Sequence, residues 1–203
     1  MGLSRWMIIA GLLATAGGCT TVRTSDPPRT ATEQFLLSTA ATMAIEQLSA
    51  DQLRGRSVFI DSSYLSVIDQ SYIVGEVRGH LLMAGAKLAT QRDQSEAVVE
   101  VRSGGSGIDR YEFLLGIPAL PLGTLATAAG MPSVPVTTPE VALFKNTRQW
   151  GFTSIAIVAY WRDSGEVIAS SGPFVGRSHR EDWWFFGLGP KSISNIPTTK
   201  PLE

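Results

Sequence analysis

Residues 153–171, TSIAIVAYWRDSGEVIASS, give the clearest indication of how this chain folds. Residues 153–162 are rich in β-branched and aromatic side chains, which are typical of strands. Asp163-Ser164-Gly165 is a hairpin signal, because these residue types tolerate the backbone angles of a tight turn. Residues 166–171 then return along the first strand. We therefore predict a long antiparallel strand pair that completes the core.

Two helices and three further strands are predicted upstream of this hairpin. Thr30 and Glu33 have the spacing of a capping box, and apolar residues at helical spacing follow, so the first helix is expected from about 31 to 50. A second helix is expected to start near Asp69 or Ser71 and to stop at Gly85, a typical C-terminal cap. Strands are expected at residues 57–61, 86–90 and 97–102.

Residues 103–150 do not fit this pattern, because many glycines and prolines interrupt an otherwise apolar stretch. A loop of this length is uncommon in a compact domain and is usually functional or mobile. Its apolar content indicates that it covers the domain's own core, a partner or a membrane surface. The expected fold class is thus α+β, with a mixed, mainly antiparallel sheet, two principal helices packed on it and a long Gly/Pro-rich apolar insertion.

The first 18 residues have the pattern of a targeting segment. Arg5 is their only charge, and the apolar run at 6–16 is too short to cross a bilayer, which takes about 20 helical residues. The run ends at Ala16-Gly17-Gly18-Cys19, which resembles the lipobox of bacterial lipoprotein signals. The alternatives are an ordinary secretory signal with a stray cysteine, or a short anchor that is never cut.

Cys19 is the only cysteine in the chain, so it can form neither an internal disulfide nor a cysteine-based zinc site. We expect cleavage before Cys19, lipidation of its thiol, and a tether at 19–29 that leads to a single periplasmic domain at 30–203. Thr20 resembles an outer-membrane sorting signal, since an Asp at this position retains enteric lipoproteins at the inner membrane. The expected location is the periplasmic face of the outer membrane.

Composition and motifs exclude several function classes. The 203 residues are 44% hydrophobic and 17% charged, as in ordinary globular proteins, and a net charge of -1 offers no footprint for nucleic acid. Gly104-Gly105-Ser106-Gly107-Ile108 misses the Gly-x-Ser-x-Gly pattern of a hydrolase, because Ile108 stands where the last glycine is needed. We expect no cofactor, no metal and no enzymatic activity.

The aromatic run Trp183-Trp184-Phe185-Phe186 is the most unusual feature after the targeting segment. Alternation in a strand would send Trp183 and Phe185 to one face and Trp184 and Phe186 to the other. One pair must then pack against a second hydrophobic surface. The candidates are the apolar 103–150 segment, a partner protein and lipid headgroups. Together with Leu114 and Leu115, this run is the candidate partner surface.

Two rival functions remain open. A small hydrolytic or metal-dependent enzyme could use Asp61, Asp109 and His179, and it requires these side chains to lie within bonding distance in a pocket. An oligomeric secretion-type pore subunit would insert residues 111–148 into the membrane. His80, between Val77 and Leu81, is expected to be a boundary residue of the second helix rather than a base.

The mature chain also resembles a family of uncharacterised bacterial lipoproteins from planctomycetes, over residues 30–37, 58–65, 85–102 and 108–118. The order of elements, with Val58-Phe59-Ile60-Asp61 and residues 97–101, is similar to the periplasmic domain of curli-secretion and penicillin-binding-protein-activator lipoproteins. The resemblance implies a non-enzymatic accessory, assembly or scaffolding role at the cell envelope. The implied partners are membrane lipid through Cys19 and an envelope protein, with a homo-oligomer also open.

Overall fold

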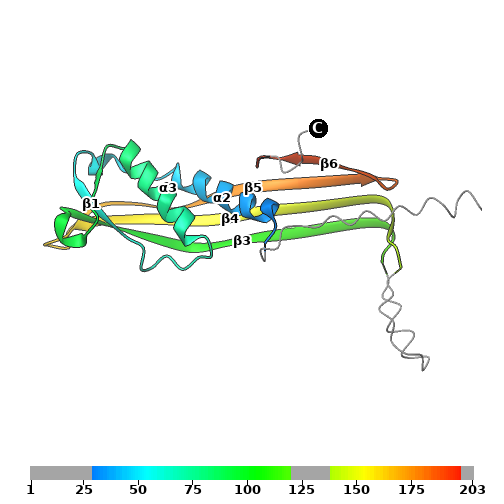
Figure 1. Ribbon diagram of the computed structural model, residues 1–203, viewed down its shortest axis with the longest axis horizontal. Coiled ribbons are helices and arrows are strands. Elements are labelled where there is room, and N and C mark those ends of the chain that lie inside the picture. The colour runs from blue at the N-terminus through cyan, green and yellow to red at the C-terminus, as the bar shows by residue number, and fades with distance from the viewer. Residues whose placement is uncertain (1–28, 120–137, 198–203) are drawn as a thin grey trace, which may run out of the picture. The chain divides into compact units, whose positions relative to one another are not determined.

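The structure, a computed structural model, describes residues 29–119 and 138–197, and its fold is built from Ala31 onward. Six strands form one sheet in the order β2-β1-β3-β4-β5-β6 (Figure 1). The strands are β1 (Ser57–Asp61), β2 (Lys87–Leu88), β3 (Ala97–Ile117), β4 (Val141–Trp161), β5 (Val167–Phe185) and β6 (Leu188–Ser194). Strand β1 runs parallel to β2 and β3, and the remaining pairs are antiparallel. The expected mixed α+β class is therefore confirmed.

Helix α2 (Ala31–Ile45) lies directly against the backbone of β4 and β5 (Figure 1). A Cβ atom at Gly176 would lie 1.8 Å from the Ala40 carbonyl oxygen, and one at Gly151 would lie 2.7 Å from the Leu36 carbonyl oxygen. The Ser178 hydroxyl donates to the same Leu36 oxygen at 2.6 Å. Small residues on both sides thus allow the helix to approach the sheet closely.

Helix α3 (Gln70–Met83) starts and stops where the sequence predicts. Gly85 has φ +91°, a conformation that glycine adopts without strain. The Gly85 amide donates to Leu82 and the Ala86 amide donates to Leu81, which is the hydrogen-bond pattern of a Schellman cap. Leu81, fully buried, anchors the end of this helix in the core.

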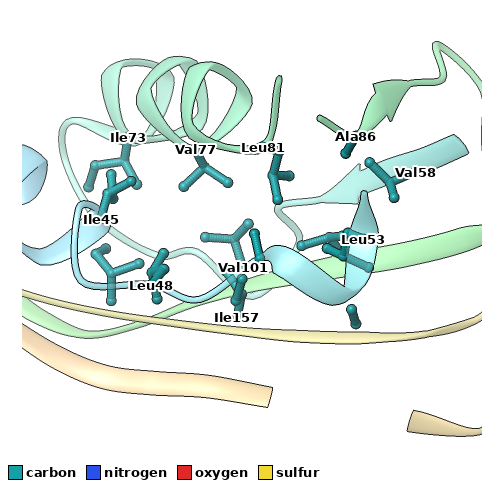
Figure 2. Packing of buried hydrophobic residues seen from close by; sticks show 14 of the residues in the cluster. Ile45, Leu48, Leu53, Val58, Ile73, Val77, Leu81, Ala86, Val101 and Ile157 are labelled. Atoms are coloured by element: carbon teal, nitrogen blue, oxygen red, sulfur yellow. The ribbon is translucent and has the colours of Figure 1, made fainter. Parts of the chain in front are cut away.

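The core lies between the two helices and the inner part of the sheet. Figure 2 shows Ile73, Val77 and Leu81 of α3 above Val101 and Ile157 of the sheet, with Ile45, Leu48 and Leu53 beside them. The short 3-10 helices η1 (Asp51–Leu53) and η2 (Arg92–Gln94) complete the connections. Each large apolar side chain buried here contributes roughly 1.5–3 kcal/mol.

Two elements are shorter in the structure than the sequence predicts. Helix α2 ends at Ile45 rather than near residue 50, because the amides of Gln47 and Leu48 bond three residues back and turn the chain. This turn directs Leu48 into the core. The strand expected at 86–90 is reduced to Lys87–Leu88, since the chain turns away toward η2.

The prediction of a structureless insertion at 103–150 was wrong for its described parts. Strand β3 continues to Ile117 and β4 begins at Val141, with pairing from Ser106↔Thr153 to Ile117↔Val141. Bulges in β3 accommodate Gly104 and Gly116. Gly116 has φ +155°, and a Cβ atom would not fit there, because it would lie 2.1 Å from the Val141 oxygen. These residues lengthen the sheet instead of covering the core. Residues 120–137 lie outside the described residues.

The C-terminal hairpin forms as predicted and is longer than expected. Gly165 has φ +74°, and the Trp161 amide donates to the Glu166 carbonyl oxygen to close the turn. Both strands run well beyond residues 153–171, β4 toward Val141 and β5 toward Phe185.

Candidate interaction surface

The sheet has an outer half, which we define as residues 107–117 of β3, 141–151 of β4 and 177–185 of β5. Gly151 and Ser178 face α2, so their face is the helix face of the sheet. Side chains alternate along a strand, so the neighbours of these two residues point to the opposite face. Neither α2 nor α3 covers that face, which we call the open face (Figure 1).

Four aromatic side chains gather on the open face: Phe113, Phe144, Trp183 and Phe185, here called the aromatic surface. Trp150 lies on the same face six residues along β4 from Phe144, and its ring contacts His179 instead. Phe144 lies at their centre, with its ring centroid 5.8 Å from Phe113, 5.6 Å from Trp183 and 5.3 Å from Phe185, all in edge-to-face geometry. Trp183 and Phe185 stack at 6.5 Å. Such pairs contribute about 0.5–1.5 kcal/mol each beyond burial.

The border of the aromatic surface is open to solvent, whereas Phe144 and Trp183 at its centre are half-buried. Phe113 is 56% exposed, and Leu115 and Phe185 are similarly exposed. Beside them lies a groove of about 400 Å³, lined by Tyr111, Glu112, Phe113, Phe144, Asn146, Arg148 and Trp183. Contiguous exposed apolar side chains of this kind mark interaction sites in soluble proteins.

Polar groups border this groove. Arg148 lies 3.5 Å from Glu181 and its guanidinium lies 5.8 Å from the Trp183 ring, in cation-π geometry. The Trp183 Nε1 donor is buried and has no hydrogen-bond acceptor within the part of the chain that the structure describes. An aromatic centre with a charged border is the anatomy of many protein interfaces, and an unsatisfied buried donor is unusual in a finished core.

The structure divides the predicted partner residues between two faces. Trp183, Phe185 and Leu115 lie on the open face, because Leu115 pairs with Phe144. Trp184 and Leu114 lie on the helix face, where both flank Lys145. The Lys145 ammonium lies 5.8 Å from the Trp184 ring and 3.0 Å from Glu140.

The alternation predicted for the aromatic run holds for three of its residues and is wrong for Phe186. Strand β5 ends at Phe185, and Phe186 has φ +49° in the turn to β6, so it continues no strand. Its side chain is well exposed in that turn.

Asp61, Asp109 and His179 do not form one site. Asp109 and His179 both pair with Trp150 from opposite sides, which separates them by two strand spacings, or about 10 Å. Asp61 pairs with Glu100, nine residues along β3 from Asp109, or roughly 30 Å. Within residues 29–119 and 138–197, no three His, Cys, Asp or Glu side chains are grouped so that they could hold a metal ion.

Asp61 instead orders the loop after β1. Its Oδ1 accepts from the Ser63 hydroxyl at 2.6 Å and from the Ser63 amide at 3.0 Å. These two bonds hold the pKa of Asp61 below its ordinary value. Burial opposes them, and the Arg92 guanidinium 3.6 Å away adds a smaller lowering. A wide hollow of about 800 Å³ adjoins this loop, and its lining mixes serines such as Ser62 and Ser106 with apolar residues such as Val67.

The two histidines make contacts that hold elements of the fold together. His80 Nε2 lies 2.8 Å from the Leu48 carbonyl oxygen, which ties α3 to the end of α2, as expected of a boundary residue. The His179 ring lies 5.3 Å from Trp150 on the open face, and its backbone amide donates to Asn195. Its segment is part of β5.

Cys19 and Thr20 lie outside the described residues, so their predicted roles stay predictions. In the described part, neither α2 nor α3 combines the length and the apolar character that a helix needs to cross a bilayer.

The described fold is that of an α+β protein with a mixed sheet and an exposed aromatic surface. Residues 11–198 match a family of unknown function (DUF6655), and the chain belongs to this family. No curated protein matches the chain. The expected membership in a family without an established activity is thereby confirmed, whereas the lipoprotein type and the planctomycete origin stay predictions.

Proposed function

We propose that this chain is a lipid-anchored cell-envelope protein with a non-enzymatic accessory or scaffolding role, in which the aromatic surface binds a protein partner. The observation that carries the proposal is the cluster around Phe144 on the open face, which no helix of the described chain covers. Aromatic residues, with arginine, are the types enriched at the centres of protein interfaces.

The lipid anchor is supported by the sequence at Cys19. A small-residue motif directly after a short apolar run places the only thiol of the chain at the one position that lipidation requires. Several acyl chains on that residue, at roughly 0.8 kcal/mol per buried methylene, would hold the domain durably at a bilayer. The outer membrane is the proposed location, because Thr20 rather than Asp follows Cys19.

Mass spectrometry of the protein from its native envelope tests the anchor. We expect a mature chain that starts at Cys19 and carries the added mass of the lipid. The Cys19→Ala variant should lose this mass and partition into the aqueous phase of a detergent extraction. An unmodified Cys19, or a variant that partitions like the natural chain, would contradict the anchor.

Site-specific photo-crosslinking tests the partner surface. A benzoylphenylalanine in place of Phe113 should capture a discrete protein in the native envelope, since this ring is exposed at the groove. The same probe in place of Tyr72, an exposed aromatic residue on α3, is the matched control and should capture nothing. Equal capture from both positions, or none from Phe113, would overturn the assignment of this surface.

A further inference from the structure

In the part of the chain that the structure describes, the outer part of β3 forms a long edge that no strand pairs. Strand β1 pairs with β3 only from Ala97 to Glu100, so from Val101 onward β3 is bonded to β4 on one side alone. Figure 1 shows β3 as the outermost of the three long strands. No strand of the described chain pairs with its other side. Such an edge offers a row of backbone donors and acceptors to another strand.

The other edges carry proline or lysine, and the β3 edge carries neither. Strand β2 has two residues, one of them Lys87, and β6 contains Pro190 and Lys191. The part of β5 that β6 leaves unpaired contains Pro173. Residues 97–117 contain neither proline nor lysine. Because proline and lysine are the usual protection of exposed edges, β3 is the edge left open to a partner.

The charges on this edge suit a second copy of the same strand. In an antiparallel pair that is centred on Tyr111, Arg110 lies opposite Glu112 of the second copy, twice by symmetry. The Arg110 side chain is half exposed and lies 3.5 Å from Glu33, so an ion pair with Glu112 would form beside this contact or replace it. Centring the pair on Asp109, Arg110 or Glu112 would instead place two like charges directly opposite each other. Around Tyr111 the apolar residues also meet, with Ile108 opposite Leu114. The edge is therefore self-complementary in one register.

We propose that two copies of this chain pair through residues 107–115 of β3, antiparallel about Tyr111, to form one continuous sheet. The pair brings the aromatic surfaces of both copies to the same side, because a two-fold axis perpendicular to the sheet keeps each face in place. Tyr111 of each copy then lies beside Tyr111 of the other, and Phe113 of each copy lies opposite Asp109 of the other. The proposal does not depend on the lipid anchor or on a separate protein partner.

Cysteine crosslinking in the full chain tests the register. With Cys19→Ser in every variant, Tyr111→Cys should form a disulfide-linked dimer on mild oxidation, because directly opposed residues have Cα atoms about 4.5–5.5 Å apart. Phe113→Cys is the matched control, since this residue has the same face and a similar exposure. Its two copies would be four residues out of register, about 13 Å apart, and should crosslink at least tenfold less.

A second cysteine variant checks the same register, and charge variants test it without added thiols. Asp109→Cys with Phe113→Cys should restore the dimer, since these residues lie opposite each other in the proposed register. Without added cysteines, Glu112→Arg should raise the dimer dissociation constant, measured by analytical ultracentrifugation, at least tenfold. The charge swap of Arg110→Glu with Glu112→Arg should restore the dimer.

The outcomes divide plainly. A dimer from Tyr111→Cys but not from Phe113→Cys, with rescue by the charge swap, supports the proposal. A monomer at all concentrations, equal crosslinking from both single cysteines, or a charge swap that is no better than Glu112→Arg alone would overturn it. Since Cys19→Ser chains are used, failure here leaves the proposed lipid anchor untouched.

Discussion

The inner and outer halves of the sheet use the same three strands but have different surroundings. In the inner half, Val101 and Ile157 are buried under α2 and α3. In the outer half, Phe113 and Phe185 have the same alternating arrangement and remain about half exposed. The two phenylalanines lie on the open face, opposite the helix face that buries Val101 and Ile157, so the apolar side chains change face along the sheet. The difference indicates that the inner half was selected for folding and the outer half for contact with something outside the fold.

The largest expected difference between the halves concerns leucines. Leu81→Ala should reduce the free energy of unfolding by about 3 kcal/mol or more, because it leaves a cavity in the core. Leu115→Ala, in the exposed outer half, should change it by less than about 0.5 kcal/mol. Urea denaturation followed by circular dichroism measures both. Similar losses from the two variants would mean that the outer half is as well packed as the inner half.

The next expected effect concerns the junction of the two halves, where α2 touches the sheet. Gly176→Ala should cost about 2 kcal/mol, because its Cβ would overlap the Ala40 carbonyl oxygen and displace the helix. Gly107→Ala is the matched control, since nothing lies within 4 Å of its added Cβ. Thermal melts compare the two, and an unchanged midpoint for Gly176→Ala would argue against the close helix contact.

The sequence predicts the inner half of the sheet better than the outer half. The inner elements were predicted from helical spacing, from the Gly85 cap and from the Asp163-Ser164-Gly165 turn, all of which are local signals. The outer strands were missed because Gly104, Gly105 and Gly107 lower strand propensity at their start. Those glycines lie at and beside a bulge, which only the pairing with β4 explains.

The candidate surface was predicted only in part for the same reason. Trp183 and Phe185 are conspicuous as a run, whereas Phe144 and Phe113 lie far apart in the sequence and meet only through the register of β3 with β4. A signal was nevertheless present. Residues 109–115 alternate between the face of Tyr111, Phe113 and Leu115 and the face of Arg110, Glu112 and Leu114, which is the period of a strand.

The next smaller effect concerns the loop after β1, whose contribution to stability should depend on pH, unlike the effects predicted for the two halves. Because the folded pKa of Asp61 is lowered, its charge stabilises the fold above the ordinary pKa of 3.8, and this contribution disappears as the pH falls through the folded value. Asp61→Asn should therefore cost about 0.5–1 kcal/mol at neutral pH. The difference from the natural chain should shrink below about pH 4 in urea titrations. A pH-independent difference would contradict the role of the charge.

The smallest expected effect tests whether the outer half is exposed in solution. Arg148 and Glu181 form an ion pair on the open face, and the Arg148 side chain is 48% exposed. Exposed pairs contribute about 0.2–1 kcal/mol at most, so Glu181→Gln should cost less than about 0.5 kcal/mol, and salt should remove most of that cost. A double-mutant cycle with Arg148→Gln measures the coupling. A coupling above about 1.5 kcal/mol that survives high salt would mean that the pair is desolvated, and the open face would then be covered in the free protein. In that case a second copy packed face to face would explain the aromatic surface better than the edge pairing about Tyr111, which leaves this ion pair in water.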